Sequence, residues 1–330
     1  MADKQSPLKP TATGVSRRAV LGTAVTLGAL GTVIGAGESR ANMPARTQRR
    51  GYVDGPFGLI HYYDNTGSGD NGHAGDTAGG GSLPLLMFHQ APQSARQFDA
   101  VYAPLAARGI RAIGVDLPGF GLSDVTSFVP KIEDWARIAP ALLDGLGLAT
   151  VDVLGHHTGA LLATEIALQF PDRVRKVIIN GPFPITQARR EELLQNLQTT
   201  EIDFEYRADG SHLAESFRRR YEMYGAGADP KLTTRVMVEK FQGFGPFWYG
   251  HNAAYRYDHA AALQRLKHRT LILTNTTDMI YDLAQKARQM RPDFDYAELE
   301  GGGVDIVDKA PDAWSDAVAK FLGANKNAAA

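Results

Sequence analysis

The chain has 330 residues, of which 44% are hydrophobic and 22% charged, a composition typical of a folded globular protein. The formal net charge is −1. Because residues 1–41 carry +3, the rest of the chain carries −4, so no basic surface that would attract nucleic acid is predicted. There are no cysteines, which excludes disulfides, thiolate catalysis and cysteine-based metal centres.

Residues 1–41 have the features of an export signal. Paired arginines in SRRAVL, at 16–21, precede an apolar Gly- and Ala-rich stretch at 19–37, and Ser39 and Ala41 are small residues suited to a cleavage site. This combination is typical of the twin-arginine pathway. A membrane anchor is the alternative, but the stretch is marginal in length and interrupted by glycine. We therefore expect the precursor to engage the twin-arginine export machinery. The mature protein is expected to be periplasmic or secreted and not to span a membrane.

The chain after residue 50 alternates between apolar runs and helical periodicity, which predicts a mostly parallel, doubly wound sheet. In chain order we expect two strands within 51–64, a polar surface insertion at 65–82, a strand at 84–89, a helix at 94–108, a strand at 111–116, a helix at 131–148, a strand at 150–154, a helix at 160–170 and a strand at 176–180.

The alternation breaks after residue 184, where the sequence becomes charged, aromatic and helical. A strand at 270–274, a helix at 281–290, a strand at 295–299 and a final helix at 312–322 resume it. An interruption late in such a sheet is best interpreted as a cap over the site. The expected domains are a signal at 1–41, a first core part at 42–184, a helical cap at 185–263 and a second core part at 264–325.

The segment VDVLGHHTGA, at 151–160, is a strand that ends in G-x-x-x-G and continues directly into a helix. This is the context of a nucleophile elbow, a sharp turn that presents one side chain at its tip. The residues two before and two after the tip must be glycine to avoid backbone collision, and Gly155 and Gly159 occupy those places. The tip residue is therefore His157.

Several further motifs show that the chain resembles the α/β-hydrolase superfamily over about the whole mature sequence. HQAP at 89–92 resembles the oxyanion turn, and DLPGFGLSD at 116–124 resembles a loop of epoxide hydrolases and haloalkane dehalogenases. Asp278 stands where the family acid stands, and GGGVD at 301–305 resembles the loop before the last helix. The resemblance implies an α/β-hydrolase fold with a helical cap.

Two departures from that family bear on the chemistry. The nucleophile position holds His157, and the position of the catalytic histidine holds Val304. A Ser-His-Asp relay therefore lacks both its hydroxyl and its expected imidazole. Thr158, beside the tip, is expected to point elsewhere and to be a poor substitute nucleophile.

We interpret the two departures as one change. Val304 leaves room beside Asp278, and the imidazole of His157 reaches farther than a serine hydroxyl. A His157–Asp278 dyad is predicted, with Asp305 as the alternative carboxylate, acting as a general base worth about 10²–10⁴-fold. Direct nucleophilic attack by the imidazole is a weaker version of the same hypothesis.

Backbone N–H groups of Ala91 and Thr158 are predicted to stabilise developing negative charge. Gln90 replaces the usual glycine of this turn, where it either crowds the turn or adds an amide donor. His89 is expected to bond nearby backbone or to line the pocket, and His156 to point away from His157.

A metal site built from His89, His157, Asp278 and Asp305 matches no recognised zinc or iron spacing, so we expect no metal and no cofactor. The cap carries a dense aromatic group, most of it expected to be cap core: Phe241, Phe244, Phe247, Trp248, Tyr249, His251, Tyr255 and Tyr257. Trp248 and Tyr249 are predicted to line a pocket for a small apolar substrate.

Three hypotheses remain open at this point. The first is an exported enzyme that uses the His157–Asp278 base for hydrolysis or for cofactor-free lyase chemistry. The second is a non-catalytic periplasmic binding or scaffold protein, because loss of both relay partners is also what an inactive descendant would show. The third is an ester or epoxide hydrolase with a different nucleophile, such as Asp305.

Overall fold

The computed structural model describes residues 48–66, 83–225 and 227–324, which all lie in one compact unit, residues 45–330. The predicted export signal and most of the polar insertion at 65–82 lie outside the described residues. None of the described helices is long and apolar enough to cross a membrane.

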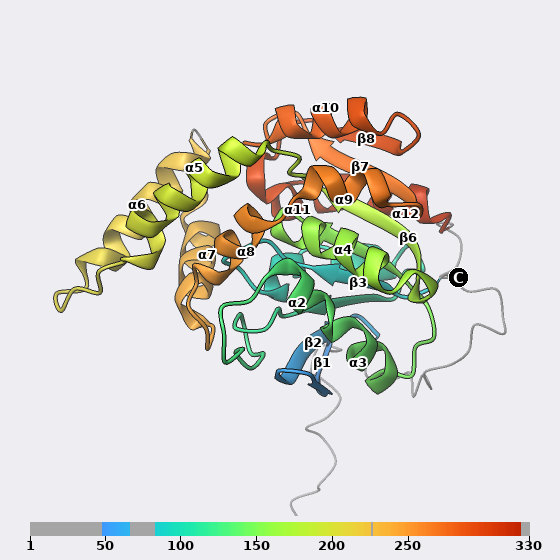
Figure 1. Cartoon of the computed structure of the whole chain (residues 1–330), viewed down its shortest axis with the longest axis horizontal. Coiled ribbons are helices and arrows are strands. Elements are labelled where there is room, and N and C mark those ends of the chain that lie inside the picture. Colours follow the sequence, from blue (N-terminus) through green and yellow to red (C-terminus); the bar gives the residue numbers. More distant parts are fainter. Residues whose placement is uncertain (1–47, 67–82, 226, 325–330) are drawn as a thin grey trace, which may run out of the picture. The chain divides into compact units, whose positions relative to one another are not determined.

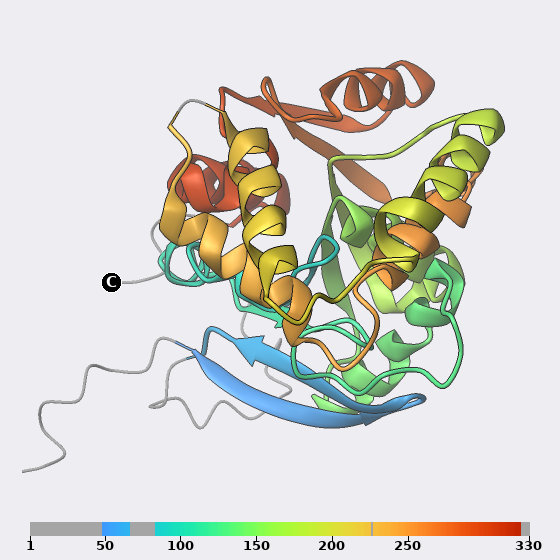
Figure 2. The ribbon, with the colours of Figure 1, turned by 90° about the vertical axis from the view of Figure 1, so that its left-hand side faces the viewer.

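The centre of the unit is an eight-stranded sheet in the order β1-β2-β4-β3-β5-β6-β7-β8. The β1–β2 hairpin is antiparallel and joins β4 in antiparallel register, whereas all pairs from β4 to β8 are parallel. Figure 2 shows this hairpin, in blue, at one end of the sheet. The strands are β1 Arg49–Gly55, β2 Gly58–Asp64, β3 Leu85–Phe88, β4 Ala112–Val115, β5 Val151–His156, β6 Val174–Asn180, β7 Arg269–Asn275 and β8 Asp295–Leu299.

Helices cover both faces of the sheet, and each face has its own apolar core. Successive residues of a strand point to opposite faces, and β3 shows this directly. Leu86 and Phe88 join the cluster beneath α2, α3, α4, α9 and α10, while Leu85 and Met87 join the cluster beneath α1, α11 and α12. The helices are α1 Tyr102–Ala106, α2 Ile132–Ala136, α3 Ile138–Gly145, α4 Thr158–Gln169, α5 Gln187–Leu197, α6 Ser211–Tyr224, α7 Pro230–Gln242, α8 Tyr249–Arg256, α9 His259–Arg265, α10 Tyr281–Met290, α11 Ile306–Lys309 and α12 Pro311–Leu322.

Two predicted helices are each split in two. The segment 94–108 forms a short 3₁₀ helix, η1 (Ala95–Phe98), followed by α1, and 131–148 forms α2 and α3. Each second helix carries a proline at its third residue, Pro104 and Pro140. Proline has no N–H and its ring clashes with the carbonyl four residues earlier, so neither helix extends back through its proline.

Between β6 and β7 the chain is helical, as predicted for the cap. Figure 1 shows α5 to α8, coloured yellow-green to orange, beside the carboxyl ends of the parallel strands. A short π-helix, η3 (Gln198–Ile202), follows α5. Helix α9 lies at the end of the predicted cap, but its Ala262 and Leu263 belong to the core cluster. The cap boundaries themselves stay a prediction.

Candidate active site

His157 occupies the sharp turn between β5 and α4. Its backbone angles are φ 49° and ψ −110°, and it is the one residue other than glycine among those described with a positive φ. An L-residue held there is strained, and such strain concentrates at functional sites. A Cβ on Gly155 would lie 1.8 Å from the carbonyl oxygen of Gly159, so the elbow glycines are sterically required.

The imidazole of His157 pairs with Asp278, the residue predicted as its partner. Nε2 of His157 lies 2.9 Å from Oδ2 of Asp278, in the loop between β7 and α10. The histidine side chain is 15% exposed, whereas that of the aspartate is fully buried behind it. The other carboxylate oxygen accepts the backbone N–H of Ile280 at 3.2 Å. Asp278 thereby engages Nε2 of His157, and Nδ1 of the same ring is available to other partners.

The electrostatics of this pair keep the carboxylate ionised. Burial alone would raise the pKa of Asp278, but the charge and hydrogen bond of His157, with a contribution from His156, outweigh it. The pKa of Asp278 is therefore below its ordinary value. An ionised carboxylate only accepts hydrogen bonds, so Nε2 of His157 carries a proton, and in the neutral ring Nδ1 has the lone pair.

The space around the imidazole depends on two small residues. A Cβ on Gly181, just after β6, would lie 2.5 Å from Cδ2 of His157, so the ring rests against bare backbone there. Val304 lines a cavity of about 340 Å³ together with Thr277 and Met279, the two neighbours of Asp278. Neither Asp278 nor His157 lines this cavity, so the room that Val304 was predicted to leave beside the acid stays a prediction.

The oxyanion turn lies against the elbow. A Cβ on Gly159 would meet the carbonyl oxygen of Phe88 at 2.0 Å, which brings the start of α4 onto the end of β3. Among the described residues, no hydrogen bond engages the backbone N–H of Ala91 or of Thr158. Their role as anion donors stays a prediction. The Gln90 amide donates to Asp305 at 3.4 Å.

His89 contacts backbone, the first of its two expected roles. Its Nδ1 lies 2.9 Å from the carbonyl of Gln90, and its Nε2 accepts the N–H of Leu117 at 3.0 Å. Burial lowers the pKa of His89. With both nitrogens engaged, the side chain has no lone pair for a metal, and the four-residue metal set considered above does not assemble.

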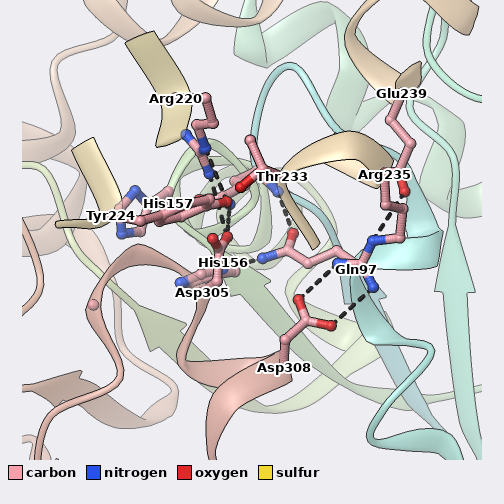
Figure 3. Close-up of polar contacts among 12 residues, drawn as sticks. Gln97, His156, His157, Arg220, Tyr224, Thr233, Arg235, Glu239, Asp305 and Asp308 are labelled. Carbon is pink, nitrogen blue, oxygen red and sulfur yellow. Dashed lines mark hydrogen bonds and ion pairs between the residues drawn. The ribbon is translucent and has the colours of Figure 1, made fainter. Parts of the chain in front are cut away.

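Asp305, the alternative partner of His157, lies instead in an ion pair with the cap. Nη2 of Arg220, on α6, is 3.3 Å from Oδ1 of Asp305, and Nε of Arg220 donates to the hydroxyl of Tyr224 at 2.9 Å. Figure 3 shows the ion pair between Arg220 and Asp305 as dashed lines. Sequence reasoning missed Arg220 and Tyr224, because the run RRRY at 218–221 does not reveal which arginine faces the core.

The expectation for His156 was wrong. It does not point away from His157: the two ring centroids are 4.6 Å apart. One nitrogen from each histidine and an oxygen of Asp278 lie within 4.8 Å of one another. The reason is that His157 leaves the strand with a positive φ, so the alternation of a regular strand does not continue into the elbow.

The cap aromatics are mixed in burial. Phe247, Tyr249 and Tyr257 are buried, as expected of a cap core, but Phe244 is 63% exposed. Trp248 is partly buried, and its ring packs edge-to-face against that of Tyr249, with 4.8 Å between the ring centroids. The pocket role of Trp248 and Tyr249 stays a prediction.

Comparisons with known proteins place this geometry in a family. The chain is 30% identical over 189 residues to 2-hydroxy-6-oxononadienedioate/2-hydroxy-6-oxononatrienedioate hydrolase of Cupriavidus pinatubonensis, covering 51% of this chain and 62% of that one. It is 27% identical over 118 residues to (E)-2-((N-methylformamido)methylene)succinate hydrolase of Acinetobacter baylyi, covering 35% and 44%. The chain thus spans less than two thirds of the length of either relative.

Solved structures share the fold. The enol-lactonase from Burkholderia xenovorans superimposes with a TM-score of 0.63 at 18% identity, over 83% of this chain and all of that one. These homologues and fold neighbours are hydrolases. The family model described as alpha/beta hydrolase fold matches residues 84–302. The chain belongs to the α/β-hydrolase fold family.

Proposed function

We propose that this protein is a small-molecule hydrolase in which His157, oriented by Asp278, is the general base. The observation that carries the proposal is the 2.9 Å contact between Nε2 of His157 and Oδ2 of Asp278, made by a residue at the strained tip of the elbow. A buried carboxylate behind a partly exposed imidazole is the arrangement that orients a base and stabilises its protonated form.

In the proposed reaction, Nδ1 of His157 takes a proton from a water molecule as its oxygen attacks the electrophilic carbon of the substrate. A bond from the water oxygen to that carbon forms, and the negative charge develops on the substrate oxygen. Backbone N–H groups of Ala91 and Thr158 are the proposed donors to that oxygen. The bond to the leaving group then breaks, and the imidazolium returns its proton to that group.

The proposed substrate carries a carboxylate. The charge of Arg220 acts on the buried His156, whose ring lies 4.6 Å from that of His157, and guanidinium groups bind carboxylates in planar, bidentate geometry. The two relatives named above act, by their names, on a dioate and on a substituted succinate. This proposal differs from the expectation of an apolar substrate drawn from the sequence, and the turnover screen described below decides between the two.

The test is a turnover screen of the purified protein against 4-nitrophenyl esters, enol lactones, 2-hydroxy-6-oxo dioates and amidomethylene succinates. We expect His157→Ala and Asp278→Asn to lower kcat by about 10²–10⁴-fold. His268→Ala serves as the matched control, because the ring of this histidine lies 3.1 Å from the carbonyl of Pro171 and the residue precedes β7, at the far end of that strand from Asp278.

Turnover that survives His157→Ala would remove the base from the proposal and favour another nucleophile. Carboxylates that bind without any turnover would favour the binding-protein hypothesis. Cleavage without uptake of solvent oxygen, measured in H₂¹⁸O, would assign lyase chemistry instead of hydrolysis.

We also propose export through the twin-arginine pathway, supported by the paired arginines Arg17 and Arg18 and the apolar stretch that follows. The test is fractionation of cells that express the full chain, alongside the variant with Arg17→Lys and Arg18→Lys. We expect wild-type protein in the periplasm or medium and the double variant inside the cell. Equal distribution of the two would refute this route.

A further inference from the structure

A cavity of about 990 Å³ lies at the end of the sheet formed by the β1–β2 hairpin. Its walls come from β1, β2, the segment from Ser94 to Asp99, the loop after β4, and Gln242, the last residue of α7. Neither His157 nor Asp278 is among the described residues that line it. A cavity of this volume can hold a small organic molecule.

Tyr63 contributes to this cavity a hydroxyl without a protein partner. The residue is 7% exposed, and its ring belongs to the core cluster beneath α1. Its hydroxyl makes no hydrogen bond to a described residue, and the oxygen is not one of the side-chain atoms sealed from solvent. Because Tyr63 lines the cavity, this oxygen opens into it. A tyrosine buried to this extent usually has a partner for its hydroxyl, so the free group indicates a ligand.

At neutral pH the hydroxyl of Tyr63 is a donor. Burial, together with the charges of Asp116 and Asp99, raises the pKa of Tyr63 to about 12, although Arg96 and Arg50 act in the opposite direction. The hydroxyl therefore keeps its proton and can donate it in a hydrogen bond to an acceptor atom of a ligand.

Arg50 adds a positive charge on the same face of the sheet. It lies directly opposite Tyr63 in the antiparallel register of β1 and β2, and opposite residues of such a pair put their side chains on one face. Both residues line the cavity, and Arg50 makes no ion pair with a described carboxylate. A guanidinium beside a hydroxyl donor suits a carboxylate or phosphate group, which accepts several hydrogen bonds at once.

Two carboxylates in the same cavity are already engaged by donors of the protein. The two oxygens of Asp116 each accept a backbone N–H, at 2.7 Å and 2.9 Å. Oδ2 of Asp99 lies 3.4 Å from Nε of Arg96. Arg50, in contrast to Arg96, can therefore take an anionic group without giving up an ion pair.

We propose that this cavity binds a small organic anion, whose carboxylate or phosphate is held by the guanidinium of Arg50 and the hydroxyl of Tyr63. The site is separate from the His157–Asp278 pair, so it does not depend on the proposed function. The cavity is far larger than one phosphate or carboxylate group. Leu122 and Gln242, which also line it, offer an apolar side chain and an amide to the rest of the ligand.

The experiment is calorimetric titration of the purified protein with tartrate, glycerol 3-phosphate, inorganic phosphate and glycerol. We expect one of the two organic anions to bind about tenfold or more tightly than inorganic phosphate, because the rest of the molecule adds contacts that a bare ion lacks. Tighter binding of tartrate would identify a carboxylate ligand, and tighter binding of glycerol 3-phosphate a phosphate ester. Glycerol, which has no charge, is expected not to bind.

Two variants remove the proposed donors one at a time. Arg50→Met and Tyr63→Phe are each expected to weaken binding of the preferred organic anion about tenfold, the size expected for a hydrogen bond to a charged group. Because the hydroxyl has no partner in the protein, Tyr63→Phe is also expected to keep the wild-type melting temperature. Arg288→Met is the matched control, since it removes the same charge from an exposed position on α10, near β8 at the opposite edge of the sheet.

Four results would overturn the inference. They are no binding of either organic anion, equal binding by Arg50→Met and Arg288→Met, binding by Tyr63→Phe equal to wild type, and inorganic phosphate binding as tight as that of the organic anions. The last result would indicate an adventitious ion only. A lower melting temperature of Tyr63→Phe with unchanged binding would give the hydroxyl a structural role instead.

Discussion

The elbow and the cap helix α7 are held in place by different physical means. The elbow is fixed by backbone packing, since Gly155 and Gly159 leave no room even for a methyl group. Helix α7 is fixed by side-chain charges that cross from the cap to the core. Glu239 accepts from the N–H and hydroxyl of Ser94, both at 3.1 Å, and Arg235 pairs with Asp308 at 2.7 Å.

The elbow backbone cannot shift without displacing α4. The position of helix α7, in contrast, can change when one of its charged side chains is removed or neutralised. The residues that α7 contacts follow the two active-site loops: Ser94 comes after the oxyanion turn, and Asp308 comes after Asp305. Burial raises the pKa of Glu239 to about 7, although Arg235 and the hydrogen bonds from Ser94 lower it. The position of His157 is thus fixed by close backbone packing, whereas the position of α7 depends on Glu239, whose protonation changes with pH.

The largest effect is expected from Gly155→Ala. The new Cβ would lie 1.8 Å from the carbonyl oxygen of Gly159, a backbone atom that cannot move aside without displacing α4. We expect a loss of more than about 3 kcal/mol in the free energy of unfolding, measured in urea. Gly210→Ala is the control for packing, since nothing lies within 4 Å of a Cβ there. Its φ of 74° adds backbone strain that Gly155, whose φ is not positive, does not carry, so any loss in this control comes from strain and not from a clash. Equal losses in the two variants would mean that packing does not fix the elbow.

Removing Arg235 is expected to have the next largest effect. Arg235→Met leaves the carboxylates of Asp308 and Glu239 without their cation, and these side chains are 12% and 0% exposed. We expect a loss of about 2–3 kcal/mol in the free energy of unfolding, somewhat less than for a fully buried pair. The triple replacement with Asp308→Asn and Glu239→Gln is expected to recover part of that loss. No recovery would show that the charges are not what holds α7.

Glu239→Gln is expected to change how stability depends on pH. Because the folded-state pKa of Glu239 is raised to about 7 from an ordinary value of 4.5, its contribution is fully present below about pH 4.5 and is lost as pH rises through 7. Wild-type protein is expected to lose about 1–3 kcal/mol more than the glutamine variant between pH 5.5 and 8.5, measured by urea unfolding at each pH. Parallel pH profiles would contradict this role.

The smallest change in stability is expected from Gly181→Ala. Its Cβ would meet the end of the His157 side chain, which can turn away, so we expect a loss of only about 1 kcal/mol. The displaced ring would lengthen the contact with Asp278, and kcat is expected to fall about tenfold or more. An unchanged kcat would show that the position of the ring against Gly181 does not matter.

The strands, the elbow and the His157–Asp278 pair follow from sequence, because each has a local cause: apolar runs, two spaced glycines and a carboxylate after a strand. The predicted α/β-hydrolase fold is confirmed by the sheet and by the family match. The segments at 94–108 and 131–148 were each predicted to be one helix, but each forms two. Pro104 and Pro140, within these segments, are the sequence signal for the break. Proline should outweigh helical periodicity wherever it would fall beyond the first turn of a helix.

The contacts between cap and core could not be predicted in the same way. Arg220 and Arg235 reach their partners from helices whose orientation depends on tertiary packing, and neighbouring arginines in the sequence look equivalent. His156 was wrongly expected to face away, because the regular alternation of a strand was extended one residue into a strained turn.

Chemical rescue is the sharpest test of whether the ring of His157 is the base. In His157→Gly the imidazole is removed and a space is left beside Asp278, and added imidazole can occupy it. We expect kcat to fall steeply in this variant and to be partly restored by millimolar imidazole, in proportion to its neutral form. Wild-type kcat in His157→Gly, or a deep loss that imidazole does not relieve, would contradict the claim that this ring is the base.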